Sequence, residues 1–223
     1  MTTSRPTPSA FETAYRAAFA DGADRVVSVH MSAELSGTWD SARLAAQEFD
    51  YGAVRVVDSR STAMGLGFAV LAAARAAAEG AGAGAVQDAA VSTVDRTSVF
   101  FYVDTLEYLR RGGRIGAAQA FVGTALAVKP LLYMRDGRVV PLEKVRTAAK
   151  AIARLLDVVA QAAGDDEVDV AVQHLAAPER AEQVSAALRE RLPRLGQLIT
   201  LEVAAAVGVH TGPGTVGVVV CRR

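Results

Sequence analysis

The chain has 223 residues, with 24 basic and 24 acidic side chains and a formal net charge of zero. This length suffices for one large domain or two small ones with their own hydrophobic cores. The charge balance excludes a general electrostatic attraction to nucleic acid or to an anionic membrane. No apolar run approaches the roughly 20 residues of a membrane span, and a single cysteine, Cys221, excludes an internal disulfide framework. We therefore expect a cytoplasmic protein in which Cys221 is a structural strand residue.

Strand and helix patterns alternate through the first half of the chain. A helix is expected to begin near Ser9, which would cap it, and strands are expected over 25–31 and 53–57. A long alanine-rich helix follows over 62–79, and the glycine-rich stretch 79–85 should form a mobile connection to the next helix. Such alternation favours parallel pairing of the strands.

The second half of the chain introduces antiparallel pairing. An apolar strand is expected over 98–103, and Asp136-Gly137 is a strong turn signal between strands 128–134 and 138–142. The remaining predicted elements are a helix over 146–162, a strand over 168–174, a helix over 178–191 and strands near 197–204 and 215–221. These patterns together predict an α/β protein with a mixed sheet in its second half.

Small polar groups are concentrated in two segments that follow predicted strands. The first, Leu35–Ala42, places hydroxyls and a glycine before the helical spacing resumes. Free backbone N–H groups and the positive end of a helix dipole favour an anion there, such as a carboxylate or a phosphate. From spacing alone, Ser36 and Thr38 have a simpler interpretation as caps of the helix that follows.

The second polar segment surrounds His210, which precedes the glycine turn Gly212-Pro213-Gly214. We expect a loop here whose backbone N–H groups form an anion-binding concavity. The alternative is an ordinary solvent-facing loop histidine. His30 and His174 lie in apolar strands and are interpreted as structural, and no cluster has the spacing of metal ligands.

Seven motifs in order along the chain give it a resemblance to a known family. They are Thr3-Ser4-Arg5-Pro6, Leu35-Ser36-Gly37-Thr38, Val57-Asp58-Ser59 with Met64-Gly65-Leu66-Gly67, Leu106-Glu107-Tyr108-Leu109, Gly112-Gly113-Arg114-Ile115, Val128-Lys129-Pro130 and His210-Thr211-Gly212-Pro213-Gly214. The chain thereby resembles the DegV family of bacterial fatty-acid-binding proteins, whose members include the substrate-carrying subunit of fatty acid kinase. The resemblance runs from about residue 2 to the C-terminus. The usual family chain starts earlier, with an extra strand, helix and hairpin, so we expect either a natural short form or a start codon assigned too far downstream.

The resemblance implies a two-lobed α/β fold with a lipid ligand between the lobes. The N-terminal lobe, 1–95, would be a parallel α/β layer, and the C-terminal lobe, 96–223, would contain a mixed sheet. The ligand would be one long-chain fatty acid in a buried tunnel, with no cofactor and no metal. By the same resemblance, the chain would present this ligand to the catalytic subunit of fatty acid kinase, which would form an acyl phosphate for phospholipid metabolism.

The resemblance also implies which residues hold the fatty acid. They are Thr3, Ser4, Ser36, Gly37, Thr38, His210 and Thr211. Arg5 stands where the family usually has glutamine. Arg114 ends a basic run that otherwise resembles an exposed helix C-terminus with a glycine stop, and it is a candidate contact for the head group or the kinase. Lys129 matches a family lysine but is not included in the predicted site.

The sequence contains no specific spacing for catalysis by this chain alone. Gly65-x-Gly67 lacks the third glycine of a dinucleotide fingerprint, and Asp58-Ser59 is most simply interpreted as an N-cap. We therefore predict a carrier without catalytic residues. The alternatives are a small-molecule hydrolase or phosphotransferase that uses Asp58, Ser59 and His210, and a truncated family member that binds no lipid.

Overall fold

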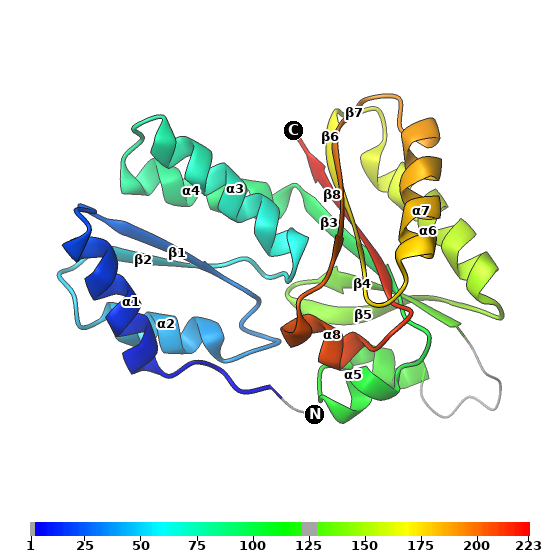
Figure 1. The fold of residues 1–223 in the computed structure, drawn as a ribbon, viewed down its shortest axis with the longest axis horizontal. Helices are drawn as coiled ribbons and strands as arrows, with labels where there is room; N and C mark the ends of the chain where they lie inside the picture. The colour runs from blue at the N-terminus through cyan, green and yellow to red at the C-terminus, as the bar shows by residue number, and fades with distance from the viewer. Residues whose placement is uncertain (1–2, 122–128) are drawn as a thin grey trace. The chain divides into compact units, whose positions relative to one another are not determined.

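The computed structural model describes residues 3–121 and 129–223, which form two compact units (Figure 1). The N-terminal unit is Thr3–Asp95, and the C-terminal unit contains Arg96–Arg223. Residues 1–2 of the expected N-terminal lobe lie outside the described residues. Each unit is described by itself below.

The N-terminal unit is a parallel α/β layer. Its elements are α1 (Pro8–Ala20), β1 (Val26–His30), α2 (Thr38–Ala46), β2 (Val54–Asp58), α3 (Met64–Ala78) and α4 (Ala83–Asp95). Strands β1 and β2 pair in parallel, as the alternating pattern predicts, with His30 opposite Asp58. Helices α1 and α2 cover one face of this pair, and α3 and α4 cover the other (Figure 1).

The two faces of β1 differ because successive side chains of a strand point to opposite sides. Val27 and Val29 pack against the buried alanines and valines between the strands and helices α3 and α4. On the other face, the Tyr15 hydroxyl of α1 donates to Ser28 Oγ at 2.9 Å, and Ser28 Oγ lies 2.7 Å from His30 Nε2. Burial lowers the pKa of His30, and the charge of Asp58 opposes that shift. His30 thus belongs to a partly buried hydrogen-bonded chain.

The predicted start of α1 near Ser9 is confirmed within one residue, but the predicted cap is wrong, and the connection after α3 is shorter than predicted. Helix α1 begins at Pro8, and its cap is Thr7, whose side chain accepts a hydrogen bond from Ala10 N at 3.3 Å. A proline in the first turn favours this start because its fixed φ suits a helix and its missing N–H is not needed there. Helix α4 begins at Ala83, so the connection after α3 is shorter than the expected 79–85. Gly80, with φ +82°, ends the preceding helix.

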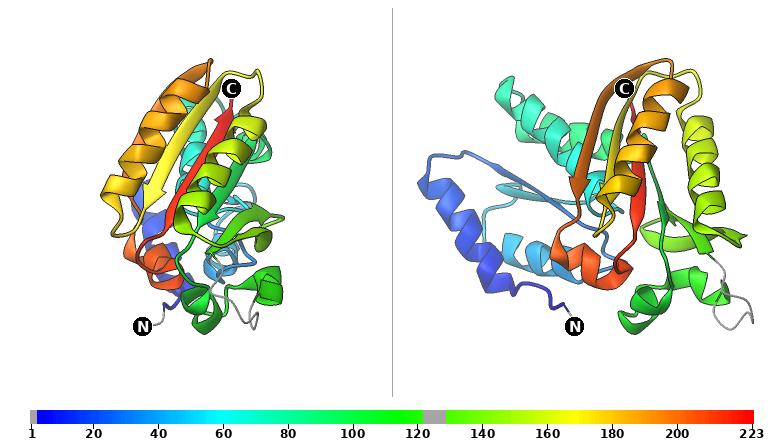
Figure 2. Two further views of the ribbon diagram at one scale, coloured as in Figure 1. Left: turned by 90° about the vertical axis from the view of Figure 1, so that its right-hand side faces the viewer. Right: turned by 45° about the vertical axis from the view of Figure 1, so that its right-hand side comes forward.

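The C-terminal unit is built on a six-stranded mixed sheet (Figure 2). Its elements are β3 (Thr97–Tyr102), α5 (Glu107–Arg111), a 3₁₀ helix (Gly116–Phe121), β4 (Lys129–Arg135), β5 (Arg138–Val145), α6 (Ala148–Ala163), β6 (Val168–His174), α7 (Pro178–Arg191), β7 (Leu195–Glu202), α8 (Ala205–Thr211) and β8 (Val216–Arg222). The strand order is β5-β4-β3-β8-β6-β7. Only β6 and β7 pair in parallel among these neighbours.

The predicted hairpin is present as β4 and β5. Its turn residues Asp136 and Gly137 have φ of +49° and +77°, as a two-residue turn with the twist of the flanking strands requires. Arg135 pairs with Arg138 across this turn. Val128, the first residue of the expected strand, lies outside the described residues.

Helices α6 and α7 lie side by side against the sheet and enclose the core of the C-terminal unit (Figures 1 and 2). Leu155 and Val159 of α6 are fully buried, as are Leu188 of α7 and Val172 of β6. Spacing of three or four residues puts such side chains on one helix face, which explains why this face packs on the sheet. Cys221 is buried in β8 as a free thiol, in agreement with the expected strand position.

The contribution of the N-terminal cap of α6 to the stability of the C-terminal unit can be tested. The Thr147 side chain accepts from Lys150 N at 3.2 Å and caps the helix. Replacing Thr147 by alanine should lower the free energy of unfolding by about 1 kcal/mol, measured by urea denaturation, because an orphan N–H loses its partner. Thr147→Ser keeps the acceptor and should be nearly neutral. Equal losses in the two variants would contradict a capping role.

Candidate functional site

The hydroxyl pair Ser36 and Thr38 lies at the start of α2. Ser36 Oγ and Thr38 Oγ1 are 2.8 Å apart, and Thr38 N donates to Ser36 Oγ at 3.3 Å. The N-cap residue is Gly37, and this cap makes no side-chain hydrogen bond. Because one hydroxyl hydrogen serves the mutual bond, the other remains available to an acceptor outside the pair. Ser36 Oγ thus accepts the first N–H of α2, as the capping interpretation predicts, while one hydroxyl hydrogen of the pair remains for a ligand.

The loop between β1 and this pair is held by backbone bonds. Ser32 N donates to Ser61 O at 2.8 Å, and Ser36 N donates to Ser32 O at 3.1 Å. The Asp58 carboxylate at the end of β2 lies 3.4 Å from Ala33 N. Two adjacent loops of the parallel strand pair thus fix the position of the hydroxyl pair.

The prediction that Asp58-Ser59 caps the following helix is wrong. Asp58 Oδ1 accepts from Arg60 N at 2.7 Å, so the carboxylate closes its own turn. Ser59 is fully buried and donates to Ser61 O at 3.3 Å. The N-cap of α3 is Ala63, which makes no side-chain cap bond. Tight turns in this loop satisfy the two polar side chains before the helix begins.

The predicted contact residues Thr3 and Ser4 belong to the same unit as the hydroxyl pair. Both are exposed, and they precede α1 on a stretch without regular secondary structure. The next residue, Arg5, extends its side chain across Gly37: a Cβ on that glycine would lie 2.7 Å from Arg5 Cδ and would overlap Nη1. The stretch from Thr3 therefore passes next to the start of α2.

His210 lies in a helix, which corrects the predicted loop. It is in the last turn of α8, and its imidazole lies against Gly112 at the end of α5. A Cβ on Gly112 would overlap His210 Nδ1, so a glycine is required at this contact. Burial lowers the pKa of His210, and the neighbouring charge of Arg114 lowers it further. His210 is consequently held as a neutral ring that donates through one nitrogen at neutral pH.

The turn after His210 is not the predicted anion-binding concavity. Gly212 N donates to Gly208 O at 2.8 Å, and Gly214 N donates to Leu175 O at 2.9 Å. Proline between them has no N–H. Thr211 is buried, and its hydroxyl donates to Val207 O at 3.4 Å. The two glycine N–H groups of this segment thus attach it to α8 and to the residue that follows β6.

Arg114 follows the expected glycine stop of α5. Gly113, with φ +71°, donates to Arg110 O at 3.0 Å, and Arg114 N donates to Leu109 O at 2.9 Å, which together form a Schellman cap. Arg114 Nη1 donates to Gly112 O at 2.6 Å. The guanidinium is half-buried and thus lies beside the glycine that contacts His210.

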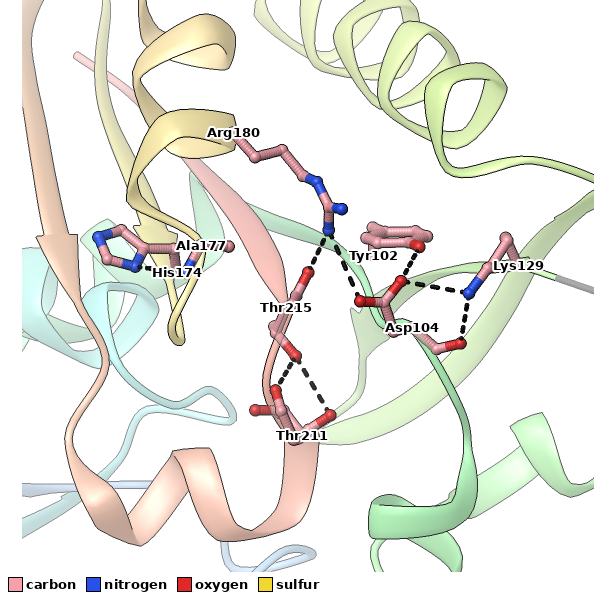
Figure 3. Close-up of polar contacts among 10 residues, drawn as sticks. Tyr102, Asp104, Lys129, His174, Ala177, Arg180, Thr211 and Thr215 are labelled. Atoms are coloured by element: carbon pink, nitrogen blue, oxygen red, sulfur yellow. Dashed lines mark hydrogen bonds and ion pairs between the residues drawn. The ribbon is translucent and has the colours of Figure 1, made fainter.

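A charged cluster around Asp104 was not predicted from the sequence. Figure 3 shows Lys129 and Arg180 directed at Asp104 from two sides, with Tyr102 beside them. Lys129 Nζ lies 3.2 Å from Asp104 Oδ1, Arg180 Nη1 lies 3.8 Å from Oδ2, and the Tyr102 hydroxyl donates to Oδ1. Burial would raise the pKa of Asp104, but these hydrogen bonds and positive charges outweigh it and hold the pKa below its ordinary value.

This cluster also holds the turn that follows α8. Arg180 Nη1 donates to Gly214 O at 2.6 Å, and a Cβ on Gly214 would overlap Asp104 Oδ2. Thr215 Oγ1 donates to Thr211 O at 3.1 Å and to Gly212 O at 2.7 Å (Figure 3). Asp104 therefore contacts the turn after His210 at Gly214 and is linked to it through Arg180. The sequence signal was present, as a charged residue directly after a buried strand, but its partners come from β4 and α7.

Within the described residues, no three or more histidine, cysteine, aspartate or glutamate side chains are placed to hold a metal ion. His174 is buried, and its Nδ1 lies 3.5 Å from Ala177 N (Figure 3). None of the helices in the described part of the chain has the length and apolar character needed to cross a membrane.

The sequence and the structure of this chain are both similar to those of known proteins. The profile of the family described as "Uncharacterised protein, DegV family" matches residues 1–223. The DegV domain-containing protein SCO2569 of Streptomyces coelicolor is 56% identical over 227 residues, which cover 100% of this chain and 79% of that protein. The DegV family protein Cg2579 from Corynebacterium glutamicum has a similar structure, with a TM-score of 0.93 and 36% identity over 99% of this chain and 84% of that one. A structure described as "Fatty Acid Binding of a DegV family Protein from Thermus thermophilus" has a TM-score of 0.94 and 36% identity, covering 100% of this chain and 79% of that one. This chain belongs to the DegV family.

Proposed function

We propose that this chain binds one long-chain fatty acid and acts as its carrier. The observation that carries the proposal is its membership of a family in which a protein of the same fold binds fatty acid. Burying an acyl chain of about 15 methylenes in a tunnel supplies a gross driving force near 12 kcal/mol, which chain ordering partly offsets. An ionised carboxylate then needs hydrogen-bond donors, because an unpaired buried charge is costly.

We assign the carboxylate to the hydroxyl pair Ser36 and Thr38 and to the imidazole of His210. The available hydroxyl hydrogen of the pair and a ring N–H are suitable donors. Thr3, Ser4, Gly37 and Thr211 complete the proposed site, with Arg114 as a contact of the head group or of a partner. Thr211 would contribute through its position, because its hydroxyl is bonded to Val207 O.

The carrier proposal is tested by native mass spectrometry of protein purified without detergent. A stoichiometric fatty acid, identified after extraction, is the expected result. Protein that is folded but empty, and that also fails to bind added palmitate or oleate, would overturn the proposal. In that case the enzyme and the non-binding alternatives would become the better interpretations, although the full burial of Ser59 argues against its use as a nucleophile.

The role of His210 predicts a pH dependence of binding. Burial and Arg114 lower the pKa of His210 in the free protein, and a bound carboxylate should raise it again. Binding would then take up a proton, so palmitate affinity should increase a few-fold as the pH falls from about 8 to about 6. His210→Gln keeps a donor but cannot titrate, and its affinity should lack this increase. Parallel pH profiles for the two proteins, measured by titration calorimetry, would contradict the assignment.

We further propose that a separate fatty acid kinase phosphorylates the bound acid and that both proteins are cytoplasmic. The single free thiol of Cys221 suits a reducing compartment. The test is to supply loaded protein, ATP and a fatty acid kinase catalytic subunit, and to trap acyl phosphate with hydroxylamine. Acyl hydroxamate should form only when all three components are present. Product formed without the kinase subunit would reassign catalysis to this chain.

A further inference from the structure

Arg5 places its guanidinium against Gly37, the residue between the two members of the hydroxyl pair. Its Nη1, Cδ and Cζ are the atoms nearest to a Cβ built on Gly37, with Cδ at 2.7 Å and Cζ at 3.2 Å. Gly37 lies between the two residues whose hydroxyls are 2.8 Å apart. The guanidinium therefore lies across the backbone that separates these hydroxyls, and the missing side chain of Gly37 makes the room for it.

The charge of Arg5 is not neutralised by a carboxylate of the described residues. Neither an ion pair nor a hydrogen bond is formed by its side chain there, whereas two other arginines of the same unit have acidic partners. Arg16 bonds to Glu12 at 2.7 Å, and Arg60 bonds to Asp95. Arg5 is exposed, so its five N–H donors face solvent with their charge uncompensated.

A guanidinium beside hydroxyl donors is suited to an oxyanion. Its planar N–H groups match the spacing of carboxylate or phosphate oxygens and can bind two of them at once. A phosphate monoester carries more negative charge than a carboxylate and has three terminal oxygens, so it gains more from the same cation. The side-chain amide of glutamine, by contrast, supplies two donors and no charge.

We propose that Arg5 is a head-group-binding and specificity-determining residue, whose guanidinium pairs with the anion at Ser36 and Thr38 and favours an acyl phosphate over a free fatty acid. This inference rests on the proposed function. It adds Arg5, which is absent from the predicted site, to the residues that bind the head group, and the contribution of Arg5 is its positive charge.

The test compares two ligands of equal chain length, palmitate and hexadecyl phosphate, the latter a stable analogue of an acyl phosphate. Arg5→Gln should lower the affinity for hexadecyl phosphate about tenfold and the affinity for palmitate about threefold. The reason is that a charge-assisted hydrogen bond is lost at a partly exposed site. The salt dependence of binding should decrease in the same variant. Arg16→Gln removes the same charge from an exposed position of α1 and should change neither affinity.

A second variant tests whether the guanidinium must lie at its observed position, because it keeps Arg5 but displaces its side chain. Gly37→Ala keeps Arg5 but places a Cβ where Nη1 lies, and its φ of −71° allows alanine without backbone strain. It should reproduce the selective loss of hexadecyl phosphate affinity while circular dichroism remains unchanged. The inference fails, and the proposed function stands, if the parent binds palmitate but Arg5→Gln changes the affinities for the two ligands no more than Arg16→Gln does. If the parent binds neither ligand, both fail.

Discussion

Replacing Ser36 by alanine and Thr38 by valine together is expected to weaken palmitate binding by about 10- to 100-fold. The change removes the hydroxyl hydrogen that the pair can donate to a carboxylate, and a hydrogen bond to a charged group contributes about 1.5–3 kcal/mol. Fluorescence displacement or titration calorimetry at fixed pH and ionic strength measures the loss. The free energy of unfolding should fall by about 1 kcal/mol or less, because Ser36 Oγ accepts a single long bond from Thr38 N at the start of α2.

Each single variant should lose less than half of the binding free energy for palmitate that the double variant loses. The hydroxyls are bonded to each other, so removal of one partner frees the other to donate outward. Ser9→Ala with Thr13→Val is the matched control, since it deletes two exposed hydroxyls from α1 of the same unit. Binding of palmitate by the Ser36 and Thr38 double variant at parental affinity would remove these residues from the site.

Gly214→Ala is expected to destabilise the C-terminal unit by about 2–4 kcal/mol in urea unfolding. About 1–2 kcal/mol comes from forcing a non-glycine residue into positive φ, here +81°, and the rest from displacing the Asp104 carboxylate that the new Cβ would overlap. Because Gly214 belongs to the turn after His210, palmitate affinity should fall as well.

The control for this change is Gly113→Ala, which also has positive φ but has nothing near its Cβ position. It should cost only the backbone strain. Adding Asp104→Ala to Gly214→Ala removes the overlapping carboxylate, so the double variant should be more stable than the sum of the single losses indicates. Additive losses would show that Asp104 does not hold the turn.

Local patterns predicted much of the secondary structure. Strand 168–174 and helix 178–191 have the bounds that hydrophobic periodicity predicts, and the Asp136-Gly137 hairpin forms because few residue pairs suit its positive φ angles. Errors occurred where a neighbouring residue competed for the same role. Thr7 caps α1 in place of Ser9 because Pro8 sets the start of the helix.

The segment around His210 shows where local patterns are insufficient. Glycine and proline after the histidine indicate a turn, but whether the glycine N–H groups remain free depends on acceptors elsewhere. These acceptors are Gly208 O in α8 and Leu175 O after β6. The neutral state of His210 similarly depends on burial against Gly112, a residue distant in sequence.

The sequence by itself determined the α/β class, the strand and helix periods and the family, because these depend on residue order and on contacts between near neighbours. Tertiary structure alone decided that Lys129 and Arg180 meet at Asp104 and that the Arg5 guanidinium lies over Gly37. The physical reason is that the strength of a charge interaction depends on distance and solvent exposure in space, and these quantities are absent from the order of residues along a chain.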